Sequence, residues 1–592
     1  MNQQEIEIPE GERPSLSWTS DVAAEMLQKL GIEYIALNPG ASYRGLHDSL
    51  VNYLGNRNPQ MLLCLNEDHV LSIAHGYAKA TDKMMACALH SNVGLMHGLM
   101  GIFNAWCDRM PMLILGATGP VAVEKRRPWI DWIHTTKDQG ALLRNFTKWD
   151  DEPRSAPSIV EGMLRAAQMS MTPPFAPTYV CLDSGLQEEK LAKPVHIPDI
   201  SRFAPLPAPG ATAAQLDHIA SVLLESRSPL LLMGRAGRSE EAWKRRVRLA
   251  ELLGAKVLTS IRERSVFPTD HPLNAAPPIQ WMSPQVKAVV AGADVIVGLD
   301  WPELNGTLLQ VSRDTESVCN SIINVSLDST LHNGWSMDYF GLPPVDIAVQ
   351  SNCDTFIEQL LPVLEERLGK NPRWNGQSYN VHSEAAYSPT AGVELQPRDI
   401  EVALHKLRSK RDFTLAHVPL GWAGDVFHFS HPLDFLGHDG GGGIGAGPGL
   451  TVGAALALRG TGRIVMGILG DGDFIQGATA LWTAAHYKIP ALFIISNNRS
   501  NFNDEIHQEA VAKMRGREVK NRWIGQRIDD PEVDLVGLAR AQGVQAGTPV
   551  STAAELEAEI ERGLEVVSKG EPYFIDARVA KGYANPPLSR GE

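Results

Sequence analysis

The sequence predicts an α/β protein built from three doubly wound parallel-sheet domains. Short apolar runs of strand length alternate with helical patterns through most of the chain, as expected for parallel sheets covered by helices on both faces. Two stretches without this alternation interrupt it, and 592 residues are too many for a single core. Three domains account for both observations.

The two interruptions set the predicted domain boundaries. Residues 193–210 carry five prolines and little periodicity, which is typical of an extended linker. Residues 370–391 are polar and equally aperiodic. We therefore expect a first domain over residues 1–192, a middle domain over 211–369 and a third domain over 392–592.

The beginning of the first domain illustrates the alternating pattern. Ser20 is expected to cap a helix over residues 21–30, Gly31 to end it, and a strand to follow over residues 32–37. Further strands are expected over residues 112–115, 178–182, 228–233, 293–300, 464–469 and 491–496.

Composition and charge argue against several classes of partner. The net charge is -14, from 54 basic and 68 acidic residues, and no long basic run offsets it, so nucleic acid is not an expected partner. The acidic, polar N-terminus does not match a secretory signal, and the apolar runs are far shorter than the roughly 20 residues that cross a membrane. Six cysteines without a CxxC pair indicate neither a disulfide framework nor a zinc site. We expect a cytoplasmic protein.

The segment from Gly470 to Asn498 carries the strongest functional signal. The strand over residues 464–469 leads into Gly-Asp-Gly-Asp, a helical pattern follows, and the strand over residues 491–496 leads into two asparagines. Ligands of an open parallel sheet bind at the carboxyl ends of its strands, so both polar clusters are expected at one edge of one sheet. Either turn alone is common in proteins, but the pair at this spacing is poorly explained by chance.

These groups suit a hard divalent cation beside a diphosphate. One carboxylate, one amide oxygen and one main-chain carbonyl leave three positions of a Mg2+ octahedron for two phosphate oxygens and a water. Asp471, Asn498 and the carbonyl of Ser500 are the predicted ligands. Gly470 and Gly472 let the backbone approach the diphosphate closely, and the following helix directs its N-terminus at the anion.

With this segment, GDGDFIQGATALWTAAHYKIPALFIISNN, the chain resembles the thiamine diphosphate enzymes of the acetolactate synthase, benzoylformate decarboxylase and pyruvate decarboxylase group. The resemblance extends over nearly the whole chain. It implies thiamine diphosphate and Mg2+ as cofactors, with Asp473 in the diphosphate-binding turn. It also implies a pyrimidine-binding domain at the N-terminus, a middle α/β domain and a diphosphate-binding domain at the C-terminus.

The resemblance places a glutamate at the start of a helix in the first domain. The sequence NEDHVLSIAHGYAKAT supplies Glu67 there, followed by Val70, Ala74 and Tyr77 on one helical face. In this family such a carboxyl shares a proton with the aminopyrimidine ring of the cofactor and so activates it. Without the resemblance, Glu67 would be a favourable charge in the first turn of a helix.

A glycine-rich run, HDGGGGIGAGPGLTVGAALAL, supplies the third element of the resemblance. The resemblance makes Ile444 the apolar support beneath the bent cofactor and the carbonyl of Gly442 the acceptor for the aminopyrimidine amino group. Gly440, Gly442 and Gly445 also match GxGxxG, the dinucleotide fingerprint, but no clear apolar strand leads into them.

Two residues are candidates for contact with the substrate. His90 lies 23 residues after Glu67, which suits the active-site histidine of the benzoylformate decarboxylase branch, although a structural role is the alternative. Asp504 lies where pyruvate decarboxylases carry an acidic residue of the substrate site. The chain departs from the benzoylformate decarboxylase pattern at Ala41 and Ser42, and the middle domain offers no convincing second histidine.

These observations predict a thiamine diphosphate- and Mg2+-dependent lyase that acts on a 2-oxo acid, as a decarboxylase with or without carboligation to a 2-hydroxy ketone. An acetolactate synthase-like carboligase is the first alternative. A flavin- or nicotinamide-dependent oxidoreductase is the second, and a non-catalytic binding subunit the third. The resemblance also implies that the two ends of each cofactor are held by different subunits, so that a homodimer is the minimum and a homotetramer is expected.

Overall fold

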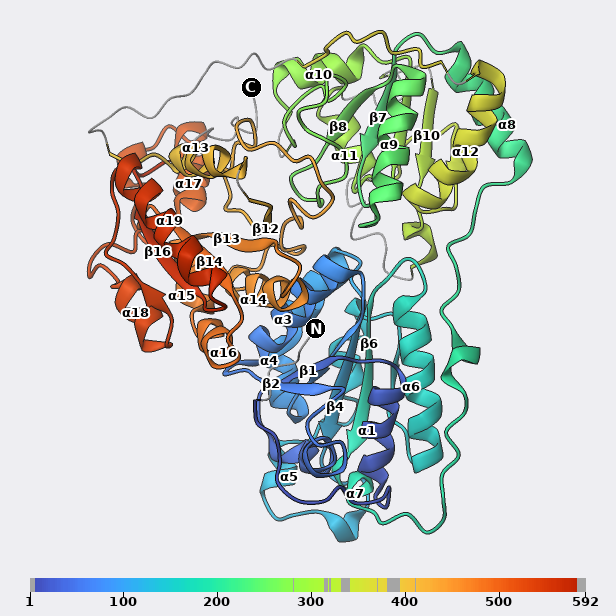
Figure 1. Cartoon of the computed structure of the whole chain (residues 1–592), viewed down its shortest axis with the longest axis vertical. Helices are drawn as coiled ribbons and strands as arrows, with labels where there is room; N and C mark the ends of the chain where they lie inside the picture. The colour runs from blue at the N-terminus through green and yellow to red at the C-terminus, as the bar shows by residue number, and fades with distance from the viewer. Residues whose placement is uncertain are drawn as a thin grey trace.

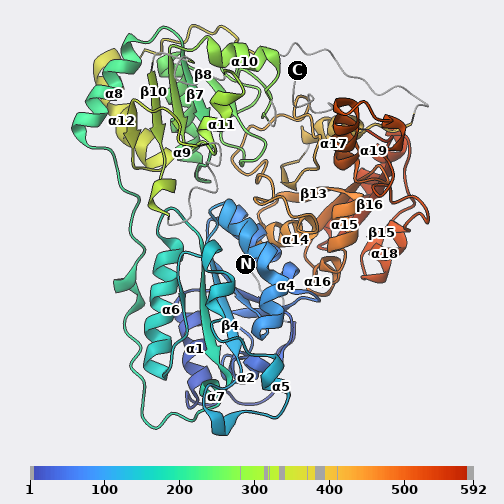
Figure 2. The same cartoon turned by 180° about the vertical axis from the view of Figure 1, so that it is seen from behind.

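A computed structural model describes residues 6–582, apart from residues 280–281, 313–317, 319–320, 332–340, 370, 381–393 and 410. The chain forms three α/β domains, each with a parallel sheet between helices (Figures 1 and 2). The fold class predicted from the alternating pattern is confirmed. The predicted second linker lies largely outside the described residues.

The N-terminal sheet has six parallel strands in the order β2-β1-β3-β4-β6-β5. The strands are β1 (Tyr34–Leu37), β2 (Gln60–Leu63), β3 (Met85–Ala88), β4 (Met112–Thr118), β5 (Asp150–Asp151) and β6 (Pro177–Asp183). The helices are α1 (Thr19–Lys29), α2 (Arg44–Asp48), α3 (Glu67–Thr81), α4 (Ser91–Cys107), α5 (Ile130–Ile133), α6 (Ala156–Met171) and α7 (Ser184–Gln187).

The start of helix α1 differs from the prediction. The helix begins at Thr19, so Ser20 lies in its first turn and does not cap it. The carboxylate of Asp21 instead accepts from the backbone N–H of Ser17 at 2.9 Å and of Trp18 at 2.8 Å. A carboxylate satisfies two helix-end donors where one hydroxyl would satisfy one, which favours this start.

The middle sheet has five parallel strands in the order β11-β10-β9-β7-β8. They are β7 (Pro229–Met233), β8 (Lys256–Thr259), β9 (Val295–Leu299), β10 (Ser321–Val325) and β11 (Ile347–Val349). The helices are α8 (Ala213–Glu225), α9 (Glu240–Leu253), α10 (Pro284–Ala291), α11 (Leu304–Leu309) and α12 (Cys353–Leu368).

The C-terminal sheet also has five parallel strands, in the order β12-β13-β14-β16-β15. They are β12 (Phe413–His417), β13 (Ile464–Gly470), β14 (Ala491–Asn497), β15 (Gln545–Ala546) and β16 (Tyr573–Arg578). The helices are α13 (Pro397–Arg408), α14 (Gly447–Ala457), α15 (Asp471–Gly477), α16 (Ala480–His486), α17 (Phe502–Met514), α18 (Leu535–Ala541) and α19 (Ala553–Ser568).

Helices α3 and α14 join the N-terminal and C-terminal domains by direct backbone contact. A Cβ atom at Gly76 would overlap the carbonyl of Leu450, and one at Gly453 would overlap the carbonyl of Ile73. One buried apolar cluster runs through both domains, because only glycine lets the two helices approach this closely.

Charged residues tie each domain to the other two. Arg109 of the N-terminal domain donates to Asp328 of the middle domain at 2.9 Å. Arg238 of the middle domain donates to the carbonyl of Pro432 at 3.0 Å, and Lys79 donates to the carbonyl of His438. Within the described part of the chain, no helix is long and apolar enough to cross a membrane.

Candidate active site

The predicted metal ligands converge at the carboxyl edge of the C-terminal sheet. Asp471 begins α15 directly after β13, and Asn498 follows β14, the neighbouring strand. The backbone N–H of Ser500 lies 3.1 Å from Asp471 Oδ2 and 3.0 Å from Asn498 Oδ1. The topology thus brings the carboxylate and the amide oxygen together at Ser500, as the spacing predicts.

The Asp471 carboxylate is buried among backbone donors. The residue is 4% exposed, and its carboxylate accepts from the backbone N–H of Gly472 at 2.9 Å and of Ser500 at 3.1 Å. Burial raises the pKa of Asp471 to about 6, although hydrogen bonds from Gly472, Arg499 and Ser500 oppose the shift. None of the described lysines or arginines pairs with it, so a divalent cation would supply the missing positive charge.

Asp473 holds the glycine-rich loop in place. One carboxylate oxygen accepts from the backbone N–H of Gly445 at 2.6 Å and of Gly447 at 3.3 Å. The other, Oδ2, is buried and lacks a hydrogen-bond partner among the described residues. The Asp473 side chain therefore supports the loop that the resemblance assigns to the cofactor.

Two glycines leave open space where a cofactor would lie. A Cβ atom at Gly442 or Gly470 would meet no atom within 4 Å, and Gly442 has a φ of +72°. Ile444 follows with a side chain that is 53% exposed, which is unusual for isoleucine. The structure thus places open backbone and one aliphatic side chain side by side here, and the roles of Gly442 and Ile444 toward a cofactor stay a prediction.

These residues surround one cavity, here called the candidate cofactor cavity. Its wall includes Gly442, Ile444, Gly470, Asp471, Gly472, Asp473, Asn498 and Ser500. Asp504, in the first turn of α17, lines it too and is exposed. Beside it, Glu505 is 1% exposed and accepts from the Ser500 hydroxyl at 2.7 Å, so Glu505 positions a predicted ligand.

Glu67 lies at the first position of α3, in the N-terminal domain. Its side chain is buried against the start of α4, where a Cβ atom at Gly94 would lie 2.9 Å from Glu67 Oε1. His97 of α4 presents its Nδ1 atom 3.8 Å from Glu67 Oε2. Sequence reasoning missed His97, because its proximity to Glu67 depends on how α3 and α4 pack.

His90 immediately precedes α4 and belongs to the same group of residues as Glu67. Its Nδ1 atom lies 2.9 Å from the Ser42 hydroxyl, which also accepts from the backbone N–H of Ser91 at 3.1 Å. Burial lowers the pKa of His90, the nearby His134 and Arg127 add to the decrease, and Glu67 opposes it. In the sequence, Ser42 is only a departure from the benzoylformate decarboxylase pattern, but in the structure its hydroxyl orients the His90 ring.

Neither Glu67 nor His90 reaches the candidate cofactor cavity of its own chain. Among the described residues, none of the first 192 lines it. Helix α4 separates His90 from the glycine-rich loop. His90 immediately precedes the helix, and Asn104, near its end, accepts from the backbone N–H of Gly441 at 3.0 Å. Fourteen helical residues span about 21 Å. Glu67 packs against the first turn of α4 at Gly94, whereas the glycine-rich loop packs against the second half of the helix at Met100 and Asn104.

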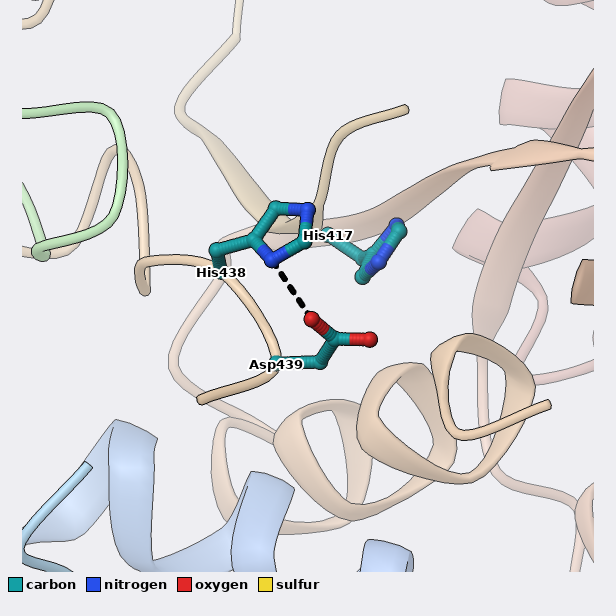
Figure 3. Close-up of side chains that lie close together, drawn as sticks. All are labelled: His417, His438 and Asp439. Atoms are coloured by element: carbon teal, nitrogen blue, oxygen red, sulfur yellow. Dashed lines mark ion pairs between the residues drawn. The ribbon is translucent and has the colours of Figure 1, made fainter. Parts of the chain in front are cut away.

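A cluster of His417, His438 and Asp439 lines the cavity beside Gly442 (Figure 3). The Nδ1 atom of His438 lies 2.5 Å from Asp439 Oδ1. The His417 ring lies 5.4 Å from the His438 ring, and its Nδ1 lies 3.1 Å from the carbonyl of Ile468. Sequence reasoning assigned no role to these three residues.

Models of three consecutive domains of one family match the chain. The N-terminal TPP binding domain of thiamine pyrophosphate enzymes matches residues 17–142, the central domain residues 216–360 and the C-terminal TPP binding domain residues 419–577. The chain belongs to the thiamine pyrophosphate enzyme family. It is a thiamine pyrophosphate-dependent enzyme of the decarboxylase and acetolactate synthase group, as the resemblance implied.

Members of this family with different activities are similar to the chain. The benzoylformate decarboxylase of Pseudomonas aeruginosa is 25% identical, covering 91% of this chain and 95% of its own length. A probable acetolactate synthase large subunit of Methanocaldococcus jannaschii is 22% identical, over 97% and 93% of the two chains. The solved benzoylformate decarboxylase of Polynucleobacter necessarius shares the fold, with a TM-score of 0.79, 20% identity and coverage of 97% and 100%.

The dinucleotide alternative for the glycine-rich run does not fit the structure. A dinucleotide fingerprint needs a strand that leads directly into its first glycine. Strand β12 ends at His417, and a long loop separates it from Gly440. The glycines instead pack against α4, where a Cβ atom at Gly441 would lie 2.8 Å from Asn104 Oδ1.

Proposed function

We propose that the chain is a lyase that uses thiamine diphosphate and Mg2+ to decarboxylate a 2-oxo acid, with or without carboligation of the product to a second carbonyl compound. The observation that carries the proposal is the convergence of Asp471, Asn498 and Ser500 beside the open backbone of Gly442 and Gly470. One buried carboxylate and one amide oxygen form a donor set that suits Mg2+. The activity named for the Pseudomonas aeruginosa relative supports the reaction type.

In this proposal, each group of residues has its own task. Asp471, Asn498 and the Ser500 carbonyl would hold Mg2+ and, through it, the diphosphate. Ile444 and the Gly442 carbonyl would orient the cofactor, which supplies a nucleophilic carbon and an electron sink when bound. Glu67 would exchange a proton with the cofactor ring, and His90 would handle protons on the substrate. Asp504, exposed in the cavity wall, would contact the substrate.

We further propose that two copies of the chain complete each site. The support is that neither Glu67 nor any other described residue among the first 192 lines the cavity of its own chain, while His90 lies about 21 Å along α4 from the residue that binds Gly441. Exposed apolar side chains flank the Glu67 face, and a second copy would cover them. They are Val93, Met96, Met100, Trp129, Trp132 and Ile133. A dimer is the minimum in this proposal, and a tetramer is expected.

Calorimetry of thiamine diphosphate binding, with and without Mg2+, tests the cofactor assignment. We expect tight binding only with Mg2+, and loss of this dependence in Asp471→Ala. Asp412→Ala is the matched control, because Asp412 is exposed at the opposite edge of the same sheet, just before β12. Equal affinity of the wild type and Asp471→Ala would reject the metal site. A bound flavin in the purified protein would instead favour an oxidoreductase.

A mixed-variant experiment tests the two-chain site. Glu67→Gln and Asp471→Ala homodimers should both be inactive toward a panel of 2-oxo acids, assayed by carbon dioxide release and by ketol formation. Co-expression should restore activity, because a mixed dimer holds one site with neither substitution. Failure to restore activity in verified mixed dimers would show that both residues serve the same chain.

A further inference from the structure

His438 and Asp439 form an ion-paired dyad at the wall of the candidate cofactor cavity, three residues before Gly442. Their side chains are 19% and 4% exposed, and the Nδ1 to Oδ1 distance is 2.5 Å. Figure 3 shows the second ring nitrogen of His438 pointing away from Asp439. An aspartate that binds Nδ1 fixes the tautomer and leaves Nε2 to act on another molecule.

The backbone of His438 is fixed by two other domains. Its N–H donates at 3.0 Å to the carbonyl of Arg262, in the middle domain, and its carbonyl accepts from Lys79 of α3. The Lys79 ammonium also donates to Asp108 at 2.5 Å, so it is itself held in place. Contacts from outside the loop therefore position the His438 ring, which suits a group that must meet a reacting atom.

The charges around His438 favour its protonated form. Burial lowers the pKa of His438, but the charge and hydrogen bond of Asp439 outweigh it and raise the pKa above the usual value. Arg262 and Lys79 oppose the increase without cancelling it. Burial alone would raise the pKa of Asp439, but His438, then His417 and Lys79, bring it well below the usual value. These shifts favour a positively charged His438 ring beside a negatively charged Asp439 carboxylate.

A metal site is the alternative for this cluster, because the ligand atoms of His417, His438 and Asp439 lie within 4.8 Å of one another. Two of those groups already form an ion pair, with Nδ1 of His438 2.5 Å from Oδ1 of Asp439. The Nδ1 of His417 lies within hydrogen-bond distance of the Ile468 carbonyl, which leaves this ring only Nε2 as a ligand. A paired imidazolium and carboxylate do not form an open cation site, since the metal would have to displace the proton between them.

We propose that His438, held by Asp439, is a catalytic residue that donates the proton on its Nε2 to the substrate. This rests on the proposed function of the cavity. The His438 Nε2–H bond breaks, a bond forms between that proton and the substrate atom that gains negative charge, and Asp439 stays ionised throughout. Neutral His438 then recovers a proton from water, which reaches its partly exposed ring. In this proposal, the C-terminal domain supplies the site with a second histidine besides His90.

The first experiment measures the dyad without any turnover. Full-length protein labelled with 13C at histidine Cε1 is titrated by NMR, and the His438 signal is assigned by its loss in His438→Gln. We expect the His438 pKa to lie above the usual histidine value and to fall by about one unit or more in Asp439→Asn, which loses the ion pair. His405→Gln, an exposed histidine of α13, should leave the titration unchanged. An ordinary pKa that Asp439→Asn does not move would overturn the proposal.

The second experiment uses enzyme loaded with thiamine diphosphate and Mg2+ and a 2-oxo acid that the wild type decarboxylates. His438→Gln should lower kcat roughly a hundredfold, as for a lost general acid, while cofactor affinity and deuterium exchange at the reactive cofactor carbon stay within twofold. In Asp439→Asn, kcat should decline at a lower pH than in the wild type, because His438 loses its proton earlier. If the pair has only a structural role, the two substitutions should lower cofactor affinity or melting temperature, and the pH dependence of kcat should match that of the wild type.

The two experiments separate the proposal from the function on which it rests. If the wild type does not retain thiamine diphosphate with Mg2+, the proposed function fails while the titration still reports on the dyad. If cofactor binding and turnover are normal and His438→Gln turns over as fast as the wild type, the proposed function stands and the role of His438 is rejected. A titration that changes on adding EDTA would instead show a metal bound at this cluster.

Discussion

The Ser42 hydroxyl lies 2.9 Å from Nδ1 of His90, although 48 residues separate them in the sequence. The same hydroxyl accepts from the backbone N–H of Ser91, which has a φ of +42°. The hydroxyl has one donor and two acceptor sites, so it can serve the Ser91 N–H and the His90 ring at the same time. The Ser42 contact thus holds the orientation of the His90 ring, with Nε2 left for another molecule.

His90→Ala should slow turnover roughly a hundredfold to ten-thousandfold, the usual range for a lost general acid or base. Deuterium exchange at the reactive cofactor carbon should stay normal, because that step is assigned to Glu67. When an acceptor aldehyde is supplied, the ratio of ketol to aldehyde product should rise. Unchanged turnover together with a lower melting temperature would show that His90 has a structural role and not a catalytic one.

Ser42→Ala should lower kcat roughly tenfold, equivalent to about 1.4 kcal/mol for one lost hydrogen bond to a catalytic group. Ser42→Thr keeps the hydroxyl and should recover most of the loss. Ser568→Ala, at the C-terminal end of α19, is the control for a serine remote from the site. Equal rates for the alanine and threonine variants would show that Ser42 does not act through its hydroxyl.

Glu67→Gln should bind thiamine diphosphate normally but slow deuterium exchange at the reactive cofactor carbon by about a hundredfold. The amide keeps the size of the side chain and cannot exchange a proton with the ring. Glu161→Gln, on the exposed face of α6, provides the control. An exchange rate within a factor of two of the wild type would remove Glu67 from this role.

The raised pKa of Asp471 should make the proposed Mg2+ binding dependent on pH. Below pH 6 the carboxyl is protonated, so Mg2+ must displace a proton and its affinity should fall about tenfold per pH unit. Because folding raises this pKa from 3.8 to about 6, protonated Asp471 stabilises the metal-free fold below pH 4. That contribution, about 3 kcal/mol, is lost as the pH rises through 6. Melting curves of the wild type and Asp471→Asn, with EDTA and with Mg2+ plus cofactor, measure both effects.

Gly453→Ala should destabilise the protein by several kcal/mol, because the added methyl group would overlap the carbonyl of Ile73. Thermal unfolding and soluble yield measure the loss. Gly292→Ala is the control, since its Cβ would lie 3.2 Å from the carbonyl of Ala288 at the end of α10. A Gly453→Ala protein as stable as this control would show that α3 and α14 can separate at little cost.

The fold and the convergence of Asp471 and Asn498 could be predicted from the sequence because both depend on local patterns. Strand length, helical period and strand-end turns place Asp471 and Asn498 on one edge without any long-range information. The partner of His90 could not be found in this way, because Ser42 approaches it only when the loops after β1 and β3 meet at the sheet edge. A role for His438 and Asp439 could not be predicted for another reason. The two residues directly precede a glycine run, and the glycines alone account for the motif in that segment.

The glycine contacts between α3 and α14 also have a mechanical consequence. Two helices in backbone contact cannot rotate or slide past each other without steric overlap, so the domains that carry Glu67 and Asp471 should move as one rigid body. Any opening of the active site must then come from loops such as residues 418–446 or from the middle domain. Hydrogen exchange should find its slowest amides in α3 and α14, at the centre of the core that the two domains share.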